Sequence, residues 1–497
     1  MARPSYNFLL GKKTAVAFRQ ITRSNSRRRS MLICAGILVA IATQATAGGI
    51  GDLLTPDILN TSSRLAKQTE GLSDPAGRQC VAASGTLTLS ASVDLALCRN
   101  PVTRSAWASA REAAAALGAA EGAWLPSVTA NGAETRSSGK YLNTAANLTS
   151  SAETNRDAVV SLSWTLYDFG SRGSKISSAA SFLDAATASL GNVVQQTVFA
   201  VVQAYYGVVA ADASLAAAHK TETIHARSLE IARALQTGGV ATLADVLQAQ
   251  TAHEEAIYAR IQAEQSTQLA HSALAVALGL SADQPLRLAA DPVPSDVPGL
   301  SGHMADLMAE ASRQRPDLKA ALANRDKAVA DVGLARAAGR PVISVGAGKS
   351  FVSNSAVAQQ DYNTLSLNVA FPLFNGFSKS YGVRQAEAGL EASEAALEQA
   401  RLAVSQSVWN AYYHMNAANS GLSTTAMLIK TAENNEEVAL GRYKSGVGTI
   451  LDVLTAESAA ASARQLRINS ELDWQVARAQ LVLALGKLTG TDPLAKA

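Results

Sequence analysis

The segments GVATLADVL (residues 239–247) and GVGTILDVL (residues 446–454) are the most informative stretches of this 497-residue chain. They share a glycine, a threonine and an aspartate at matching positions, and they stand 207 residues apart. Glycine favours chain reversal, and aspartate is favoured near the start of a helix, where it meets the positive end of the helix dipole. Each segment therefore predicts a turn followed by a helix, and the chain makes this turn twice.

The similarity between the two halves extends far beyond these turns. Residues 164–278 align with residues 371–485 at the same offset and without a gap. Further upstream the offset becomes 215, which pairs Pro126 with Pro341. We place the eight extra residues in the second copy, between Pro341 and Phe371. The chain is thus a duplicated unit.

Two long tracts lack proline, the residue that breaks helices: none occurs between Pro126 and Pro285, or between Pro372 and Pro493. Ala, Leu, Glu, Gln and Arg dominate these tracts, which is typical of long helices. We predict helices from 171 and 378 to the two glycine turns, each roughly 66 residues or about 100 Å long. Returning helices are predicted over 243–278 and 450–485.

Short segments between the helices alternate apolar with small or polar residues, as in 160–167 and 366–374. With partners that begin at the two aligned prolines, they predict β-hairpins at about 126–167 and 341–374. Each strand is about ten residues long, enough to cross a bilayer when tilted. A half-buried sheet of a soluble protein would show the same alternation. Four strands cannot close a barrel, so a membrane barrel requires several chains.

The N-terminus has the features of an export signal. Residues 1–47 contain eight basic residues and no acidic ones, followed by an apolar run at 31–42 that is too short to span a membrane. We predict cleavage after Ala47, after which acidic residues outnumber basic ones by five. The basic balance of the full chain is then no support for nucleic-acid binding. Cys80 and Cys98 are the cysteines that remain, and they are a candidate disulfide in an oxidising compartment.

Enzymatic interpretations find no support in the sequence, and we expect no catalytic residue, cofactor or metal site. Gly348-Lys349-Ser350 resembles the end of a phosphate-binding loop but lacks the earlier glycine and lies in a predicted strand. The histidines are scattered and none has the spacing of a zinc motif: His219, His225, His253, His271, His303 and His414.

Several motifs in this order resemble the TolC-type outer-membrane-factor family. They are the Arg99-Asn100-Pro101 element, the strand exit LYDFG (166–170) and the two turns, and the resemblance spans about residues 87–490. It implies a mixed α and β fold: a homotrimer with one 12-stranded transmembrane β-barrel, four strands per chain, that continues into a long periplasmic α-helical barrel. It also implies an outer-membrane location that extends into the periplasm.

On this basis we divide the chain into five parts. They are a signal peptide (1–47), a poorly structured segment (48–87), a first repeat (88–290), a second repeat (291–490) and a C-terminal tail (491–497). Each repeat comprises a helix, a hairpin and long helices. The implied partners are two further copies of the chain, a periplasmic adaptor, an inner-membrane ABC exporter or RND pump, and outer-membrane lipid.

The resemblance also assigns candidate site residues. Asp452 matches a gate aspartate, Tyr443 matches a tyrosine of the latch between neighbouring helices, and Asp245 matches its carboxylate partner. The adaptor-contact tips are Gly239, Val240, Gly446 and Val447. Two departures predict a less acidic and less firmly closed constriction: Thr455 replaces a second gate aspartate, and Gly448 replaces a latch arginine. A simpler interpretation is that Asp245 and Asp452 only cap their helices.

Two cargo classes are open within the channel interpretation. Absence of a lipobox favours protein secretion in a type I system over small-molecule efflux. The Cys80 and Cys98 pair also resembles the branch that exports repeat-in-toxin proteins such as cyclolysin. A hypothesis from another class is a periplasmic coiled-coil scaffold without a pore, which would leave the duplicated strand pairs unexplained.

Overall fold

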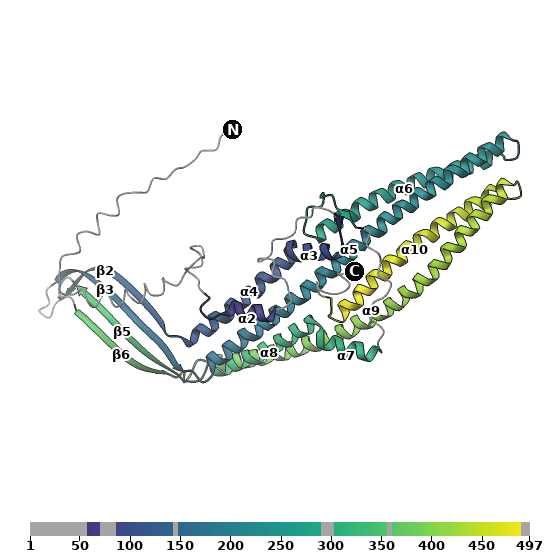
Figure 1. The fold of residues 1–497 in the computed structure, drawn as a ribbon. Coiled ribbons are helices and arrows are strands. Elements are labelled where there is room, and N and C mark those ends of the chain that lie inside the picture. Colours follow the sequence, from purple (N-terminus) through teal and green to yellow (C-terminus); the bar gives the residue numbers. More distant parts are fainter. Residues whose placement is uncertain (1–56, 70–85, 143–147, 290–302, 355–359, 489–497) are drawn as a thin grey trace, which may run out of the picture. The chain divides into compact units, whose positions relative to one another are not determined.

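The computed structural model describes residues 57–69, 86–142, 148–289, 303–354 and 360–488. The predicted signal peptide, its cleavage site after Ala47, Cys80 and the tail 491–497 lie outside the described residues. Long helices and one larger sheet make up most of the described chain (Figure 1).

Four long helices form two antiparallel pairs. The first pair is α5 (Ser171–Thr237, 67 residues) and α6 (Leu243–Ala277, 35 residues). The second pair is α9 (Ser378–Lys444, 67 residues) and α10 (Ile450–Ala484, 35 residues). These helices begin and end within one residue of the predicted positions, because glycine or serine breaks a tract that otherwise favours helix throughout.

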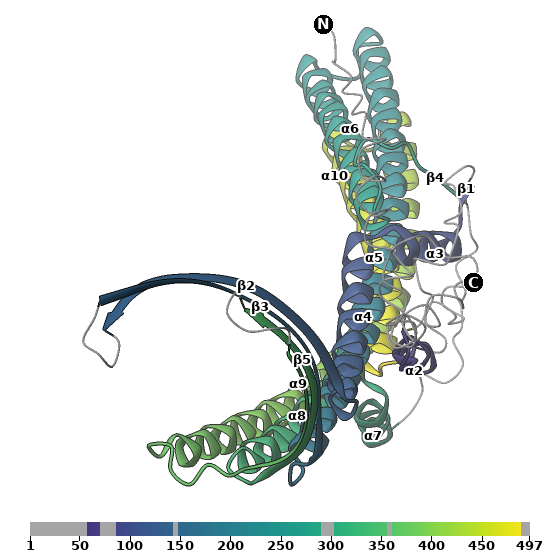
Figure 2. The ribbon, with the colours of Figure 1, turned by 90° about the vertical axis from the view of Figure 1, so that its left-hand side faces the viewer.

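The larger sheet is antiparallel, in the order β2-β3-β5-β6, and Figure 2 shows its strong curvature. Its strands are β2 (Ser127–Leu142), β3 (Leu148–Tyr167), β5 (Val342–Asn354) and β6 (Gln360–Ala370).

Three predictions about the strands were wrong: the length of the first two strands, the copy that contains the eight extra residues, and the end of the last strand. β2 and β3 contain 16 and 20 residues instead of about ten, so the extra length lies in the first copy and not in the second. β6 ends at Ala370, which leaves Phe371 and Leu373 outside the strand, because Pro372 has no N–H for a further ladder bond.

The register separates two kinds of side chain onto the two faces of the sheet. One row of cross-strand neighbours reads Thr129, Ser161, Gly348, Thr364, and the next residue of each strand belongs to the opposite face. On that opposite face an equivalent row reads Val128, Leu162, Ala347, Leu365. The sheet therefore has one face of small polar residues and one mainly apolar face, which Lys349 of β5 interrupts opposite Val160.

A buried ion pair fixes the corner between β3 and α5. Arg172 Nε and the backbone N–H of Arg172 both donate to Asp168 Oδ2 at 2.9 Å, and Arg172 Nη1 donates to the Thr165 carbonyl at 2.7 Å. The guanidinium also stacks 4.1 Å from the ring centre of Trp124. Because these contacts reach back into the strand, the helix is held in a defined direction relative to the sheet.

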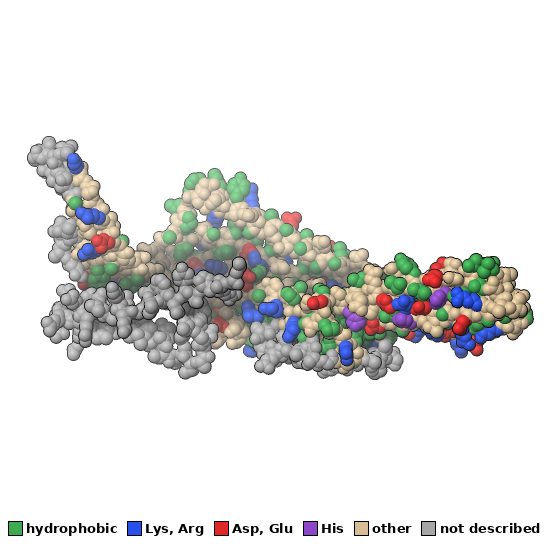
Figure 3. Space-filling view, turned by 90° about the horizontal axis from the view of Figure 1, so that it is seen from above, with side chains coloured by type: hydrophobic (Ala, Val, Ile, Leu, Met, Phe, Trp, Pro, Cys, Tyr) green, Lys and Arg blue, Asp and Glu red, His purple; other side chains and the backbone are tan. Residues whose placement is uncertain are grey.

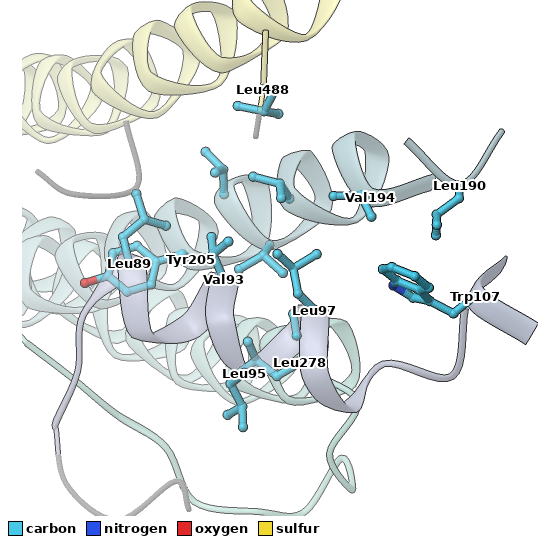
Figure 4. Close-up of a cluster of buried hydrophobic side chains, with 14 of the residues drawn as sticks. Leu89, Val93, Leu95, Leu97, Trp107, Leu190, Val194, Tyr205, Leu278 and Leu488 are labelled. Atoms are coloured by element: carbon cyan, nitrogen blue, oxygen red, sulfur yellow. The ribbon is translucent and has the colours of Figure 1, made fainter. Parts of the chain in front are cut away.

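The largest core lies around the middle of α5. Helices α3 (Leu89–Arg99) and α4 (Pro101–Glu121, followed by a 3-10 turn at Gly122–Trp124) pack on α5 there. Figure 4 shows Val93 and Leu97 of α3 facing Val194 and Tyr205 of α5. A short parallel pair, β1 (Thr86–Leu87) with β4 (Arg287–Leu288), lies beside this core. In the second half, α7 (Met304–Gln314) packs on α9, and α8 (Pro316–Ala337) packs on α5 and α9.

The segment predicted to be poorly structured contains a helix. Helix α2 (Thr61–Gln68) buries Leu65, and Arg64 forms an ion pair with Glu121 of α4. Two buried side chains in eight residues are too few for a periodic pattern to stand out in the sequence. Tertiary contacts with α4 and α5 stabilise this short helix.

Candidate functional site at the helix tips

Both helix pairs reverse direction at the same end of the described chain, as Figure 1 shows. Gly239 and Gly446 each have φ of +74°, a backbone conformation that favours glycine. The following valines donate backbone hydrogen bonds into the preceding helix, Val240 to the Leu235 carbonyl at 2.9 Å and Val447 to the Arg442 carbonyl at 3.0 Å. This is the glycine-ended helix termination that the repeated segments predicted.

Each returning helix begins with a reciprocal hydrogen-bond pair. Thr449 Oγ1 accepts from the Asp452 N–H at 3.2 Å, and Asp452 Oδ2 accepts from the Thr449 N–H at 3.0 Å. Thr242 and Asp245 make the same two bonds at 3.3 and 2.7 Å. Both aspartates therefore cap their helices, as their position at the helix starts predicted, and the gate role of Asp452 stays a prediction.

The carboxylate of Asp452 is exposed and held in its charged form. Hydrogen bonds from the backbone and side chain of Thr449, together with the positive charge of Arg442, hold the pKa of Asp452 below its usual range. A side chain at Gly448 would lie 3.4 Å from Cβ of Arg442, so the turn passes directly beside this arginine. Sequence reasoning missed Arg442, although its place next to Tyr443 in the last turn of α9 could have indicated it.

Tyr443 lies inside the protein at the tip. It is 5% exposed, and its hydroxyl has no hydrogen-bond partner among the described residues. Burial raises the pKa of Tyr443, and the negative charge of Asp245 raises it further. The structure thus brings Tyr443 near Asp245, the predicted partner, but no hydrogen bond joins them in the described part of the chain. Tyr443 stabilises the tip by burying its aromatic ring.

An apolar cluster joins the two helix pairs at their tips. Leu229 and Val246 come from the first pair, and Tyr443, Ile450 and Val453 come from the second. The turn residues remain outside this cluster: Val240 is 66% exposed and Val447 is 70% exposed. Thr455, which stands in place of a second gate aspartate of the resembled family, is also exposed and donates to the Leu451 carbonyl at 2.7 Å.

A buried polar cluster close to the tips was missed by the sequence analysis. It consists of His225 and Ser228 of α5 and Glu457 of α10. Glu457 follows the buried Val453 by four residues and precedes the buried Arg464 by seven, so it shares their helical face. The sequence signal for this cluster was a glutamate on a helical face whose other residues are buried.

Charged side chains of both signs are interspersed along the helices, together with histidine (Figure 3). Among the residues that the structure describes, no group of three or more His, Cys, Asp or Glu side chains is arranged to hold a metal ion. Cys98 is disulfide-bonded. Its pairing with Cys80 stays a prediction, since Cys80 is outside the described ranges.

Comparison with known proteins adds independent information. A family profile described as outer membrane efflux protein matches residues 92–280 and 307–487. The chain is 32% identical to Protein CyaE of Bordetella pertussis over 410 residues, which cover 81% of this chain and 84% of that protein. It is 27% identical to the toluene efflux pump outer membrane protein TtgC of Pseudomonas putida over 297 residues, which cover 58% and 60%.

Solved structures show the same fold. The outer-membrane channel OprN superposes with a TM-score of 0.70 and 22% sequence identity, covering 84% of this chain and 96% of that one. At this identity the likeness concerns the arrangement of helices and strands.

Proposed function

Because the chain belongs to the outer membrane efflux protein family, we propose that it is the outer-membrane channel of a tripartite export machine. In this proposal it passes a secreted protein from an inner-membrane ABC transporter, through a periplasmic adaptor, to the exterior. One observation carries the proposal: the chain joins a sheet with an apolar outer face directly to helices of 67 residues. One end suits lipid, and the other can cross about 100 Å of the periplasm.

The apolar face of the sheet has the height of a bilayer core. Leu365 and Leu367 of β6 are 82% and 69% exposed, which is unfavourable in water and favourable in lipid. On β3 the apolar face extends from Tyr167 to the ion pair of Arg156 with Glu134. These roughly eleven residues measure about 36 Å along the strand, or about 25 Å along the membrane normal at a tilt near 45°.

Three copies of the chain close the barrel in this proposal. Strands β2 and β6 are the edges of the larger sheet, and lipid does not tolerate open edges. Twelve strands from a homotrimer remove both edges of every copy. The helices support the same assembly, since α9 exposes the large side chains of Leu402, Trp409 and Tyr413 on its surface, where a neighbouring copy would cover them.

Within the trimer, the small polar face of the sheet lines the pore and the helices form the periplasmic tunnel. Gly239, Val240, Gly446 and Val447 lie at the tips and are the contact sites for the adaptor. Asp452, with Asp245 and Tyr443 beside it, belongs to the gate, where three symmetry copies of the carboxylate attract cations. The signal peptide is removed after about Ala47, and the mature protein resides in the outer membrane.

Secretion is preferred to small-molecule efflux on sequence grounds, namely the missing lipobox and the Cys80 and Cys98 pair. The longer and closer match to Protein CyaE supports this preference. Efflux remains the second candidate because the chain also resembles the toluene efflux pump protein.

The deciding experiment expresses the full chain and asks whether outer membranes contain a heat-sensitive trimer that conducts ions in planar bilayers. We expect a trimeric pore that selects cations, and Asp452→Ala should reduce this selectivity. A soluble, non-conducting protein would support the scaffold hypothesis instead. Deleting the chain in its host separates the cargo classes: loss of a secreted protein supports secretion, and accumulation of a fluorescent dye supports efflux.

A further inference from the structure

The two helix pairs of one chain meet mainly where α10 packs against α5. Polar contacts join the pairs along this seam, such as Gln465 Nε2 with Ser214 Oγ at 3.2 Å, and near the tips the seam contains His225, Ser228 and Glu457. Glu457 lies seven residues from the start of α10, about 10 Å at the helical rise. The cluster is therefore one or two turns away from the capping Asp452.

These three side chains are almost completely enclosed. The side chains of His225 and Glu457 are 9% and 1% exposed, and Ser228 is 1% exposed. Ser228 donates its hydroxyl proton to Glu457 Oε1. His225 Nδ1 lies 2.9 Å from Glu457 Oε2, which is an ion-pair distance without hydrogen-bond geometry.

A carboxylate at such a place needs compensation, because removing a charge from water is costly unless a partner replaces the lost hydration. Both partners of Glu457 belong to α5. The buried arginine on the same face of α10 is engaged elsewhere: Arg464 Nε donates to Glu433 at 3.0 Å, and Arg464 Nη2 donates to Glu436 at 2.6 Å, both on α9. Glu457 is thus compensated by its described neighbours only while α10 stays against α5.

We propose that His225, Ser228 and Glu457 form an internal tether that holds the α9–α10 tip against α5 and positions the gate in its closed arrangement. This inference rests on the proposed channel function. It also gives the departure at Gly448 a physical context. The turn before α10 has a glycine in place of the latch arginine. The tether supplies a polar attachment within the same chain, one or two helical turns farther from the tip. For the gate to open by movement of the second pair, this attachment has to break.

The first test measures opening of the trimer in planar bilayers. His225→Ala and the milder Glu457→Gln should each increase the frequency of openings about tenfold, a coupling of ordinary size for two linked sites. Glu471→Gln is the matched control, because Glu471 lies on the same helix but forms an exposed pair with Arg467. Exchange of the two side chains in the double variant His225→Glu with Glu457→His should restore the closed state, which a merely structural role of either residue would not predict.

A second test locks the seam instead of weakening it. Cysteines at positions 225 and 457, bridged by a short reducible crosslinker, should abolish openings and export, and a reductant should restore both. Wild-type protein treated in the same way controls for reduction of the native disulfide. Trimers that conduct normally and gate alike with the bridge intact or broken would overturn the tether and leave the channel function standing. Wild-type trimers that never conduct would contradict the channel function itself.

Discussion

The two helix tips share one backbone design but differ in what they bury. Leu243, the first residue of α6, is 61% exposed, whereas Ile450 at the aligned position of α10 is 2% exposed. Both tips have the same positive-φ glycine and the same reciprocal Thr–Asp cap. The second tip adds Tyr443, where the first has the half-buried Gln236. Local sequence therefore sets the turn in both copies, and packing buries the first residue of the returning helix in the second copy but not in the first.

This difference matters for a gate. Both pairs contribute to the apolar cluster that joins them, the first with four residues and the second with Tyr443, Ile450 and Val453, and α10 also carries Glu457 of the proposed tether. Apolar side chains are exposed at both turns, with Val240 at 66% and Val447 at 70%. We assign the stronger anchoring to the start of α10, and three experiments examine this comparison of the two tips.

The largest expected effect comes from truncating the aligned apolar residues. Ile450→Ala should lower the free energy of local opening at the start of α10 by about 2–5 kcal/mol, because it leaves a cavity in the apolar cluster. Leu243→Ala should change the corresponding value for α6 by no more than about 0.5 kcal/mol. Native-state hydrogen exchange of the trimer in detergent measures both. An equal loss at Leu243 would mean that a neighbouring copy covers the first tip.

A smaller effect, equal at both tips, is expected for the glycines. Gly239→Ala and Gly446→Ala should each cost about 1–2 kcal/mol of local stability, since φ of +74° is strained for any residue with a Cβ. Gly441→Ala is the control: this glycine lies inside α9 with open space around its Cβ position, and alanine there should stabilise by about 0.5–1 kcal/mol. Unequal costs at the two turns would contradict the identical backbone design.

The smallest expected effect is a loss of local stability at the start of α10 when the pH is lowered. Because the folded pKa of Asp452 is lowered, its contribution to the cap is complete above the usual carboxyl range, about pH 4, and is lost as pH falls through the lowered value. Protection of amides in the first turn of α10 should therefore decline in acid. Asp452→Asn should remove this step, and Asp245→Asn should leave it unchanged. A pH step that survives Asp452→Asn would assign the titration to another group.

The sequence predicted the long helices well because their signals are local. Absence of proline defines the tracts, and the glycine turns end them within one residue of the structure. The polar parts of β2 and β3 were not predicted as strand, because exposed residues such as Thr135 and Ser137 do not alternate with apolar ones. Helix α2 was missed because its formation depends on contacts with distant helices.

At the site, the caps were predictable and the buried contacts were not. Asp245 and Asp452 follow their threonines by three residues, and this spacing alone indicates a capped helix start. Ser228 and Glu457 are separated by 229 residues, and no pattern in one chain reveals which partner a buried glutamate meets. The predicted partnership of Tyr443 with Asp245 stays a prediction, since no hydrogen bond joins the two among the described residues.

The matched lengths of the helices also limit how this chain can change over time. α5 and α9 both contain 67 residues, and α6 and α10 both contain 35. Inserting one residue into α5 alone would rotate every later side chain by about 100° and move its tip by about 1.5 Å relative to that of α9. An insertion before His225 would therefore separate it from Glu457 and disrupt the shared apolar cluster. Lengthening the tunnel therefore requires matched insertions of whole helical turns in all four helices. Several linked mutations would have to occur together during evolution.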